Sequence, residues 1–317
     1  MTSKIRLTAT ISQSQNGQRL DKALVTLFPE YSRSCIKKWI LRRYVIVNNM
    51  VFDKPKIKVF NGAKINIHID DSTLLEAQNI ALNIIYEDED LIVINKPPNL
   101  VVHPGAGNPN GTLLNALLYH YPNIANVPRA GIVHRLDKDT TGLMIIAKTV
   151  LIQKRLIEAL QCRTILREYE AVVIGSMKSG GCISQPISRH TNKRTIMAIH
   201  PGGKIAITHY SIIEMFRGYT HLGLRLETGR THQIRVHMAY LNHPLVGDPI
   251  YRGKVSNKLP SVGEGGCIYK FNRQALHASR LRFYHPHRGI EMELHAPLPL
   301  DMLNLINILK EDMTEFR

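Results

Sequence analysis

A short charged segment between two apolar stretches is the part of this sequence best suited to chemistry. Residues 134–139 read His-Arg-Leu-Asp-Lys-Asp, and apolar residues precede and follow them. The cations Arg135 and Lys138 stand two residues before and one residue after Asp137. Their field would hold the carboxylate ionised, which suits a nucleophile or a base. A structural cluster of ion pairs explains the same spacing equally well.

Composition narrows the classes of function. The chain has 317 residues, with 41 Lys+Arg against 25 Asp+Glu, so its formal net charge is +16. Residues 1–70 hold 13 Lys+Arg and 4 Asp+Glu, so a net charge of +9 lies in under a quarter of the length. This imbalance indicates a polyanionic partner, and the length predicts roughly two domains.

Several kinds of site lack their sequence signatures. The four cysteines form no CxxC pair, and the chain contains neither a phosphate-binding P-loop nor a glycine-rich dinucleotide fingerprint. We therefore expect no metal and no cofactor. No apolar stretch reaches the length of a membrane span and no secretory signal is present, so we expect a cytoplasmic protein.

The elements before the charged segment begin with two helices. Apolar residues at helical spacing predict a helix over 20–28, which Pro29 ends. A second helix is predicted over 32–43, with Ser32 as its cap. Its apolar residues form an inward stripe and its basic residues lie mostly elsewhere on its surface, so a basic helix results.

A hairpin should follow these helices. Residues 45–47 and 50–52 are apolar and flank Asn48-Asn49, two residues that tolerate a positive φ. Three lysines then alternate on one face of the next segment: Lys54, Lys56 and Lys58. A solvated face explains any single lysine, whereas the concentrated set favours phosphate binding.

This N-terminal segment resembles the S4 RNA-binding domain. The resemblance rests on residues 17–21 (Gly-Gln-Arg-Leu-Asp), 32–34 (Ser-Arg-Ser) and 45–48 (Val-Ile-Val-Asn). It implies a small α/β fold that grips structured RNA through its basic second helix. We expect this domain over residues 17–70, and a linker over 71–83, where the basic character is lost.

A second domain is expected over residues 84–312. Residues 84–94 read as two short apolar strands around the acidic run 87–90. Residues 300–316 carry apolar side chains at helical spacing and predict a closing C-terminal helix.

Motifs across this second domain resemble the RluA family of pseudouridine synthases. The segment 134–142 (His-Arg-Leu-Asp-Lys-Asp-Thr-Thr-Gly) is similar to the family's signature. Residues 167–173 (Arg-Glu-Tyr-Glu-Ala-Val-Val) resemble its second motif and residues 226–237 its third. Shorter fragments that also fit begin at Pro186, His243 and Leu276. The resemblance implies an α+β fold, in which a mixed, largely antiparallel sheet carries the active cleft.

The resemblance also implies roles for individual residues. Asp137 would be the catalytic aspartate, and Tyr169 would stack on the target uracil and offer a hydroxyl for proton transfer. Arg135 would fill the space that a flipped uridine leaves, although a salt bridge to an aspartate is its structural alternative. The third motif would place Arg235 against the catalytic carboxylate, with Arg230 as the second-ranked donor.

Other residues of these motifs would shape the site or hold RNA. Leu226 and Ile234 would wall the pocket, although a role as core strand residues is equally plausible. His134, His232 and His237 have no carboxylate or cysteine at metal-ligand spacing, so packing or RNA hydrogen bonding is preferred. The basic run that starts at Arg189 favours an RNA-clasping loop over a merely solvated one.

The expected function is isomerisation of uridine to pseudouridine. The family role points to the helix 69 loop of 23S rRNA, with the pre-ribosomal large subunit as the partner. The sequence leaves open whether Asp137 attacks C1′, adds to C6 or removes a proton from C2′. A tRNA-acting synthase of the same family is the nearest alternative. A non-catalytic rRNA-binding assembly factor is the alternative from another class, and the presence of both Asp137 and Tyr169 speaks against it.

Overall fold

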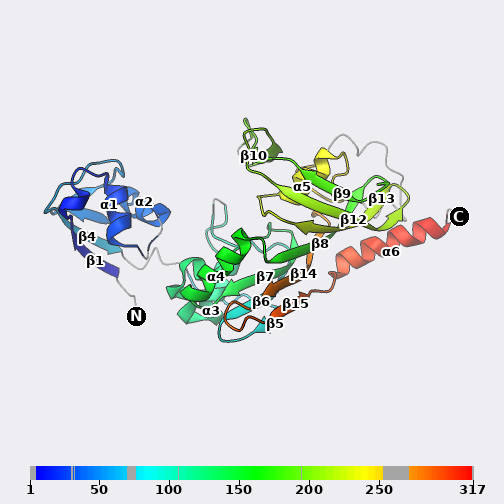
Figure 1. Ribbon diagram of the computed structural model, residues 1–317, viewed down its shortest axis with the longest axis horizontal. Coiled ribbons are helices and arrows are strands. Elements are labelled where there is room, and N and C mark those ends of the chain that lie inside the picture. The colour runs from blue at the N-terminus through cyan, green and yellow to red at the C-terminus, as the bar shows by residue number, and fades with distance from the viewer. Residues whose placement is uncertain are drawn as a thin grey trace. The chain divides into compact units, whose positions relative to one another are not determined.

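The computed structural model describes residues 5–29, 31, 33–69, 76–105, 107–193, 195–252 and 271–315. The chain divides into two compact units, residues 1–76 and residues 77–317, which are described separately (Figure 1). Within the described residues, no helix is long and apolar enough to cross a membrane.

The N-terminal unit combines one antiparallel sheet with two helices. Its strand order is β1 (Ile5–Thr10), β4 (Lys64–Ile69), β2 (Val45–Val47) and β3 (Met50–Phe52). The helices are α1 (Leu20–Leu27) and α2 (Arg33–Leu41), and a 3-10 turn, η1, spans Gln13–Gln15. Asn48 and Asn49 adopt φ values of 47° and 65° between β2 and β3, so the predicted hairpin is confirmed.

Helix α2 has the predicted basic surface. Ile36 and Ile40 are fully buried in the unit's core, whereas Lys37 and Lys38 are exposed. The helix ends two residues earlier than predicted, and Arg43 just beyond it adopts a left-handed φ of 64°. The predicted cap, Ser32, lies outside the described residues.

The second unit is built on one large sheet. Its strands, in spatial order, are β5 (Ile84–Glu87), β6 (Leu91–Lys96), β7 (Thr141–Ala147), β14 (Leu276–Tyr284), β8 (Leu166–Ile174), β13 (Tyr219–Leu226), β12 (Ile207–Phe216) and β9 (Gly181–Ser184), and β15 (Glu291–His295) pairs with β14. Every pair in this sheet is antiparallel except β7 with β14. The expectation of a largely antiparallel α+β fold is therefore confirmed.

Helices cover both faces of this sheet at β6 and β7, which explains why almost every residue of these two strands is buried. In β6, Ile92 packs in the same buried cluster as Leu113 of α3 (Leu113–His120), whereas Val93 packs with Ile152 of α4 (Val150–Gln161). Successive strand residues point to opposite faces, so each face needs its own apolar set. Helix α6 (Leu300–Glu315) packs beside β8, β12 and β13 (Figure 1).

Tight backbone turns position the charged segment before β7. Arg129 and Ala130 adopt left-handed φ values of 54° and 48° in the 3-10 turn η4 (Pro128–Gly131). Gly142, at a φ of 112°, lies so close to the backbone of Ala278 in β14 that a Cβ there would clash. The segment that holds Asp137 thus lies between a left-handed turn and a glycine that a residue with a side chain could not replace without a clash.

Candidate active site

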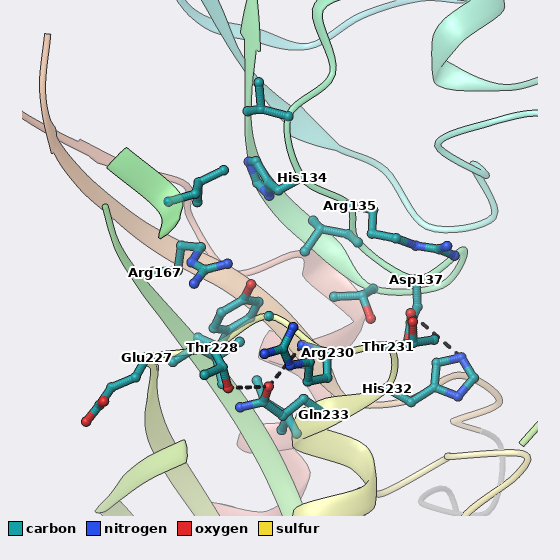
Figure 2. Close-up of a pocket in the computed structure, with 18 of the residues that line it drawn as sticks. His134, Arg135, Asp137, Arg167, Glu227, Thr228, Arg230, Thr231, His232 and Gln233 are labelled. Atoms are coloured by element: carbon teal, nitrogen blue, oxygen red, sulfur yellow. Dashed lines mark hydrogen bonds and ion pairs between the residues drawn. The ribbon is translucent and has the colours of Figure 1, made fainter. Parts of the chain in front are cut away.

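The predicted site residues meet at one cavity of the second unit. It has a volume of about 580 Å³ and is lined by the segment before β7, by β8, and by the residues that connect β13 to α5 (Gln233–Tyr240) (Figure 2). Seven of the eight predicted site residues line it: His134, Arg135, Asp137, Tyr169, Leu226, Arg230 and Arg235. The eighth, Arg189, lies at the end of β10 (Ile187–Arg189), outside this lining.

Asp137 is held by a buried arginine. Its Oδ2 accepts a hydrogen bond from Nη1 of Arg235 at 2.9 Å. The Nε and Nη2 of Arg235 donate to both carboxylate oxygens of Asp248, at 2.7 and 2.9 Å. Arg235 is only 4% exposed and Asp248 is fully buried. One guanidinium therefore joins the predicted catalytic carboxylate to a second carboxylate in the protein interior.

The second oxygen of Asp137 faces a histidine. Its Oδ1 lies 3.8 Å from Nε2 of His232, which is too long for a hydrogen bond (Figure 2). Nδ1 of His232 lies 2.8 Å from the hydroxyl of Tyr251, and the Tyr251 ring lies 5.1 Å from the guanidinium carbon of Arg235. Among the described residues, none donates a hydrogen bond to Oδ1 of Asp137, so this is the oxygen open to a substrate.

Burial and neighbouring charges shift the pKa values of this network in opposite directions. Burial alone would lower the pKa of Arg235, but the hydrogen bonds and charges of Asp248 and Asp137 raise it overall. Burial would likewise raise the pKa of Asp248, but its bonds with Arg235 lower it. Burial lowers the pKa of His232, so its imidazole is neutral at neutral pH.

Tyr169 projects from the middle of β8 into the cavity. It is 6% exposed, and burial raises the pKa of its phenol. The ring therefore offers an aromatic surface with a protonated hydroxyl at neutral pH.

The structure corrects the strand interpretation of Ile234. Leu226 ends β13 and lines the cavity as predicted, but Ile234 lines it from helix α5. Helix α5 begins at Gln233, whose Oε1 accepts hydrogen bonds from the Thr228 hydroxyl at 2.8 Å and the Arg230 amide at 3.0 Å, and these bonds tie the preceding turn to the first residue of the helix (Figure 2). His232 adopts a left-handed φ of 55°, which turns the chain into the helix.

The two other predicted arginines of the pocket differ from Arg235. Nε of Arg230 donates to the carbonyl of Ile205 at 3.0 Å, so this residue is not the donor to Asp137. Arg135 is exposed, and within the described part of the chain it forms no hydrogen bond or ion pair with Asp137 or Asp139.

The three histidines considered for a metal are separately engaged. Nε2 of His134 accepts the Ile145 amide hydrogen at 3.0 Å, and burial lowers the pKa of His134 to about 3. His237 lies between the Thr208 hydroxyl and the Gln185 carbonyl. Among the described residues, the one group with metal-ligand spacing is Asp88, Asp90 and His285, which does not line the cavity.

Sequence reasoning missed several residues of the site. Asp248 lies in a fragment that fits the family motifs, but nothing in its spacing indicates a contact with Arg235. Lys96 is fully buried, and its ammonium donates to the carbonyl of Lys138, the residue after Asp137, at 2.8 Å. Arg167 could have been found from strand alternation, since it stands two residues before Tyr169 on β8 and shares its face.

Comparisons with known proteins identify the family of this chain. Residues 90–240 match the family model described as RNA pseudouridylate synthase. A solved structure titled Human RNA Pseudouridylate Synthase Domain Containing 1 has a TM-score of 0.54 and 25% identity, and the match covers 75% of this chain and 98% of that one. A second, Human RNA Pseudouridylate Synthase Domain Containing 4, shares the fold with a TM-score of 0.56 at 24% identity, over 72% of this chain and 93% of that one.

The chain belongs to the RNA pseudouridylate synthase family, and it is an enzyme of the isomerase class. Over its whole length it is 61% identical to Ribosomal large subunit pseudouridine synthase D of Escherichia coli (strain K12), of which the match covers 98%. It is 58% identical to the protein of the same name from Haemophilus influenzae, over 98% of this chain and 97% of that protein.

Proposed function

We propose that this enzyme isomerises uridine to pseudouridine in 23S rRNA, within the helix 69 loop, with Asp137 as the catalytic carboxylate. The observation that carries the proposal is the ion pair between Asp137 and Arg235 inside the cavity. The name and the full-length similarity of the relatives support large-subunit rRNA as the substrate. An rRNA substrate makes the cytoplasm the expected compartment and the pre-ribosomal large subunit the expected partner.

The reaction breaks the bond from N1 to C1′, turns the base and joins C5 to C1′. The target uridine must leave its stack to enter the cavity. Arg235 holds Oδ2 of Asp137, so Oδ1 is the oxygen that acts on the nucleotide. Tyr169 supplies the stacking surface for uracil, and its protonated hydroxyl serves as a hydrogen-bond donor. Arg135, which is exposed and lines the cavity, occupies the space that the uridine leaves.

The remaining residues of the proposal hold the enzyme on its RNA. Leu226 walls the pocket, His134 and Arg230 contribute to its lining, and Arg189 belongs to an exposed basic hairpin that contacts flanking nucleotides. Arg194 of that hairpin lies outside the described residues. Residues 17–70 act as an S4 RNA-binding domain and residues 84–312 as the catalytic domain, with a linker over 71–83. The basic face of α2 supports the first assignment.

A site-resolved map of pseudouridine tests this proposal. RNA from cells with the gene, without it, and with an Asp137→Asn copy should differ at uridines of the 23S helix 69 loop. Loss of those pseudouridines in both altered strains is the expected result. Changes confined to tRNA would identify the enzyme as a tRNA-acting synthase. Unchanged maps would contradict the rRNA assignment.

A further inference from the structure

Arg167 differs from the buried Arg235 of the same cavity in how its charge is compensated. It is 8% exposed and lines the cavity from β8. Its Nε is sealed from solvent without a hydrogen-bond partner, and within the described chain its guanidinium forms no ion pair. Arg235, at a similar depth, is paired with two carboxylates.

An unpaired buried cation is unfavourable in the free protein. Taking part of a guanidinium out of water is unfavourable, and an ion partner normally offsets that cost. Among the described residues no neighbouring carboxylate does so, since Asp137 is bound by Arg235 and Glu227 by Arg163 at 2.6 Å. The partner that would balance the charge of Arg167 is therefore an anion from outside the chain.

The outer edge of Arg167 lies at the mouth of the cavity. Its Nη1 faces Gly229, which is exposed, and a Cβ at Gly229 would lie 2.7 Å from that nitrogen. Tyr169 and Asp137, where the base must react, line the same cavity. Glycine at position 229 thus leaves room for a ligand group to reach the guanidinium from the open side.

We propose that Arg167 is a substrate-binding residue that grips a phosphodiester group next to the flipped uridine. This inference rests on the proposed function and adds the phosphate subsite of the same cavity. A phosphodiester carries a full charge before and after the reaction, whereas uracil is neutral when it binds. The planar fork of arginine also matches two phosphate oxygens at once.

If Arg167 binds a phosphate, its substitution should change KM much more than kcat. A phosphate contact is made in both the ground state and the transition state, so Arg167→Gln should raise KM by about 10- to 100-fold with kcat changed little. Stabilisation of charge on uracil would instead lower kcat with an unchanged KM. Arg167→Gln should not lower the melting temperature of the free enzyme, since it removes an unpaired buried charge.

The decisive experiment neutralises the phosphate rather than the arginine. A stem-loop RNA with the target uridine is made with one methylphosphonate linkage, on the 5′ side or on the 3′ side of that uridine. With the wild-type enzyme, one of these RNAs should show the loss in Kd and KM that Arg167→Gln shows on normal RNA. With Arg167→Gln, the same methylphosphonate should cost nothing further.

Two further variants keep the test open to refutation. Gly229→Ala displaces the guanidinium of Arg167 without changing its charge. If Arg167→Gln folds poorly, Gly229→Ala should replace it in the test, and the same methylphosphonate should cost nothing further in that variant. Arg163→Gln is the matched control, because Arg163 lines the same cavity but is already paired with Glu227, and it should show no coupling. Independent, multiplicative losses for Arg167→Gln and both methylphosphonates would overturn the proposal. Turnover of unmodified RNA by the wild type tests the proposed function separately.

Discussion

The N-terminal unit and the catalytic unit both use positive charge, but they hold it in opposite ways. Cations such as Lys37, Lys38 and Lys56 lie exposed on the first unit. In the cavity of the second unit, Arg235 and Arg167 are buried to more than nine-tenths. Salt screens exposed charges, so each contributes little and many must act together, whereas each buried charge has a large effect alone. Single substitutions should therefore matter in the second unit and grouped ones in the first.

The largest effect is expected at the carboxylate that the buried cation holds. Asp137→Asn keeps the shape of the side chain but removes its charge, so turnover should fall by about 10³-fold or more. Affinity for RNA should change little. Tritium release from a stem-loop labelled at C5 of its uridines measures turnover, and a filter-binding titration measures affinity. Retained turnover in purified Asp137→Asn would rule out the catalytic assignment.

A smaller loss of activity is expected at Asp248, which contacts Arg235 but not Asp137. Asp248→Asn leaves the buried guanidinium of Arg235 with one charged partner, which should lower kcat by about 10- to 100-fold and stability by about 3 kcal/mol. The matched control is Asp312→Asn, which breaks the ion pair between Arg217 and Asp312, a similarly buried carboxylate of α6. It should lower the melting temperature but leave kcat unchanged. Equal kcat losses in both variants would show that only folding is affected.

The cost of burying a titratable group can also be measured, as the dependence of the free energy of unfolding on pH. Burial lowers the pKa of His134 to about 3, while an unfolded histidine titrates near 6.5. Between these values the unfolded chain binds more protons, so stability falls as the pH falls. When the pH is lowered from 7 to 5, the free energy of unfolding in urea should fall by about 2 kcal/mol less for His134→Gln than for the wild type. His103, with a pKa lowered to about 4 by burial, stays in both proteins. Parallel pH profiles would contradict the neutral buried state of His134.

The smallest effect per residue is expected on the exposed surface. Replacing Lys54, Lys56 and Lys58 together by Gln should weaken RNA binding and flatten its dependence on salt, by just under one unit of slope for each phosphate that the protein no longer neutralises. The triple Lys→Arg variant keeps the charge and serves as the control. Binding measured from low to high salt gives the slope. An unchanged slope would show that these lysines are only solvated.

The sequence predicted local structure well. The hairpin at Asn48-Asn49, the strands 84–87 and 91–96 and the C-terminal helix follow from short-range periodicity and turn chemistry. The position of Arg235 against Asp137 came from the family resemblance, and the structure has that contact. The core-strand alternative for Ile234 is wrong, because helix α5 begins at Gln233 where a strand was considered.

Partners far apart in the chain could not be predicted. Asp248 meets Arg235 through a turn whose direction no local pattern records, and Lys96 reaches Lys138 across 42 positions. Arg167 shows the opposite case, since its motif is visible in sequence but its lack of an ion partner among the described residues is not. Whether a charge is paired depends on three-dimensional packing, which single-sequence patterns do not contain.

The pairing of β7 with β14 has a consequence for when the enzyme becomes active during its synthesis. The Thr141 hydroxyl meets Nδ1 of His277 at 2.8 Å, so the contact joins residues 136 positions apart. Closing so long a loop is slow, and it must wait until β14 has left the ribosome. A nascent chain that ends after Arg235 already holds all the predicted catalytic residues but lacks the strand that anchors their loop. We therefore expect the enzyme to become active only after β14 has been translated.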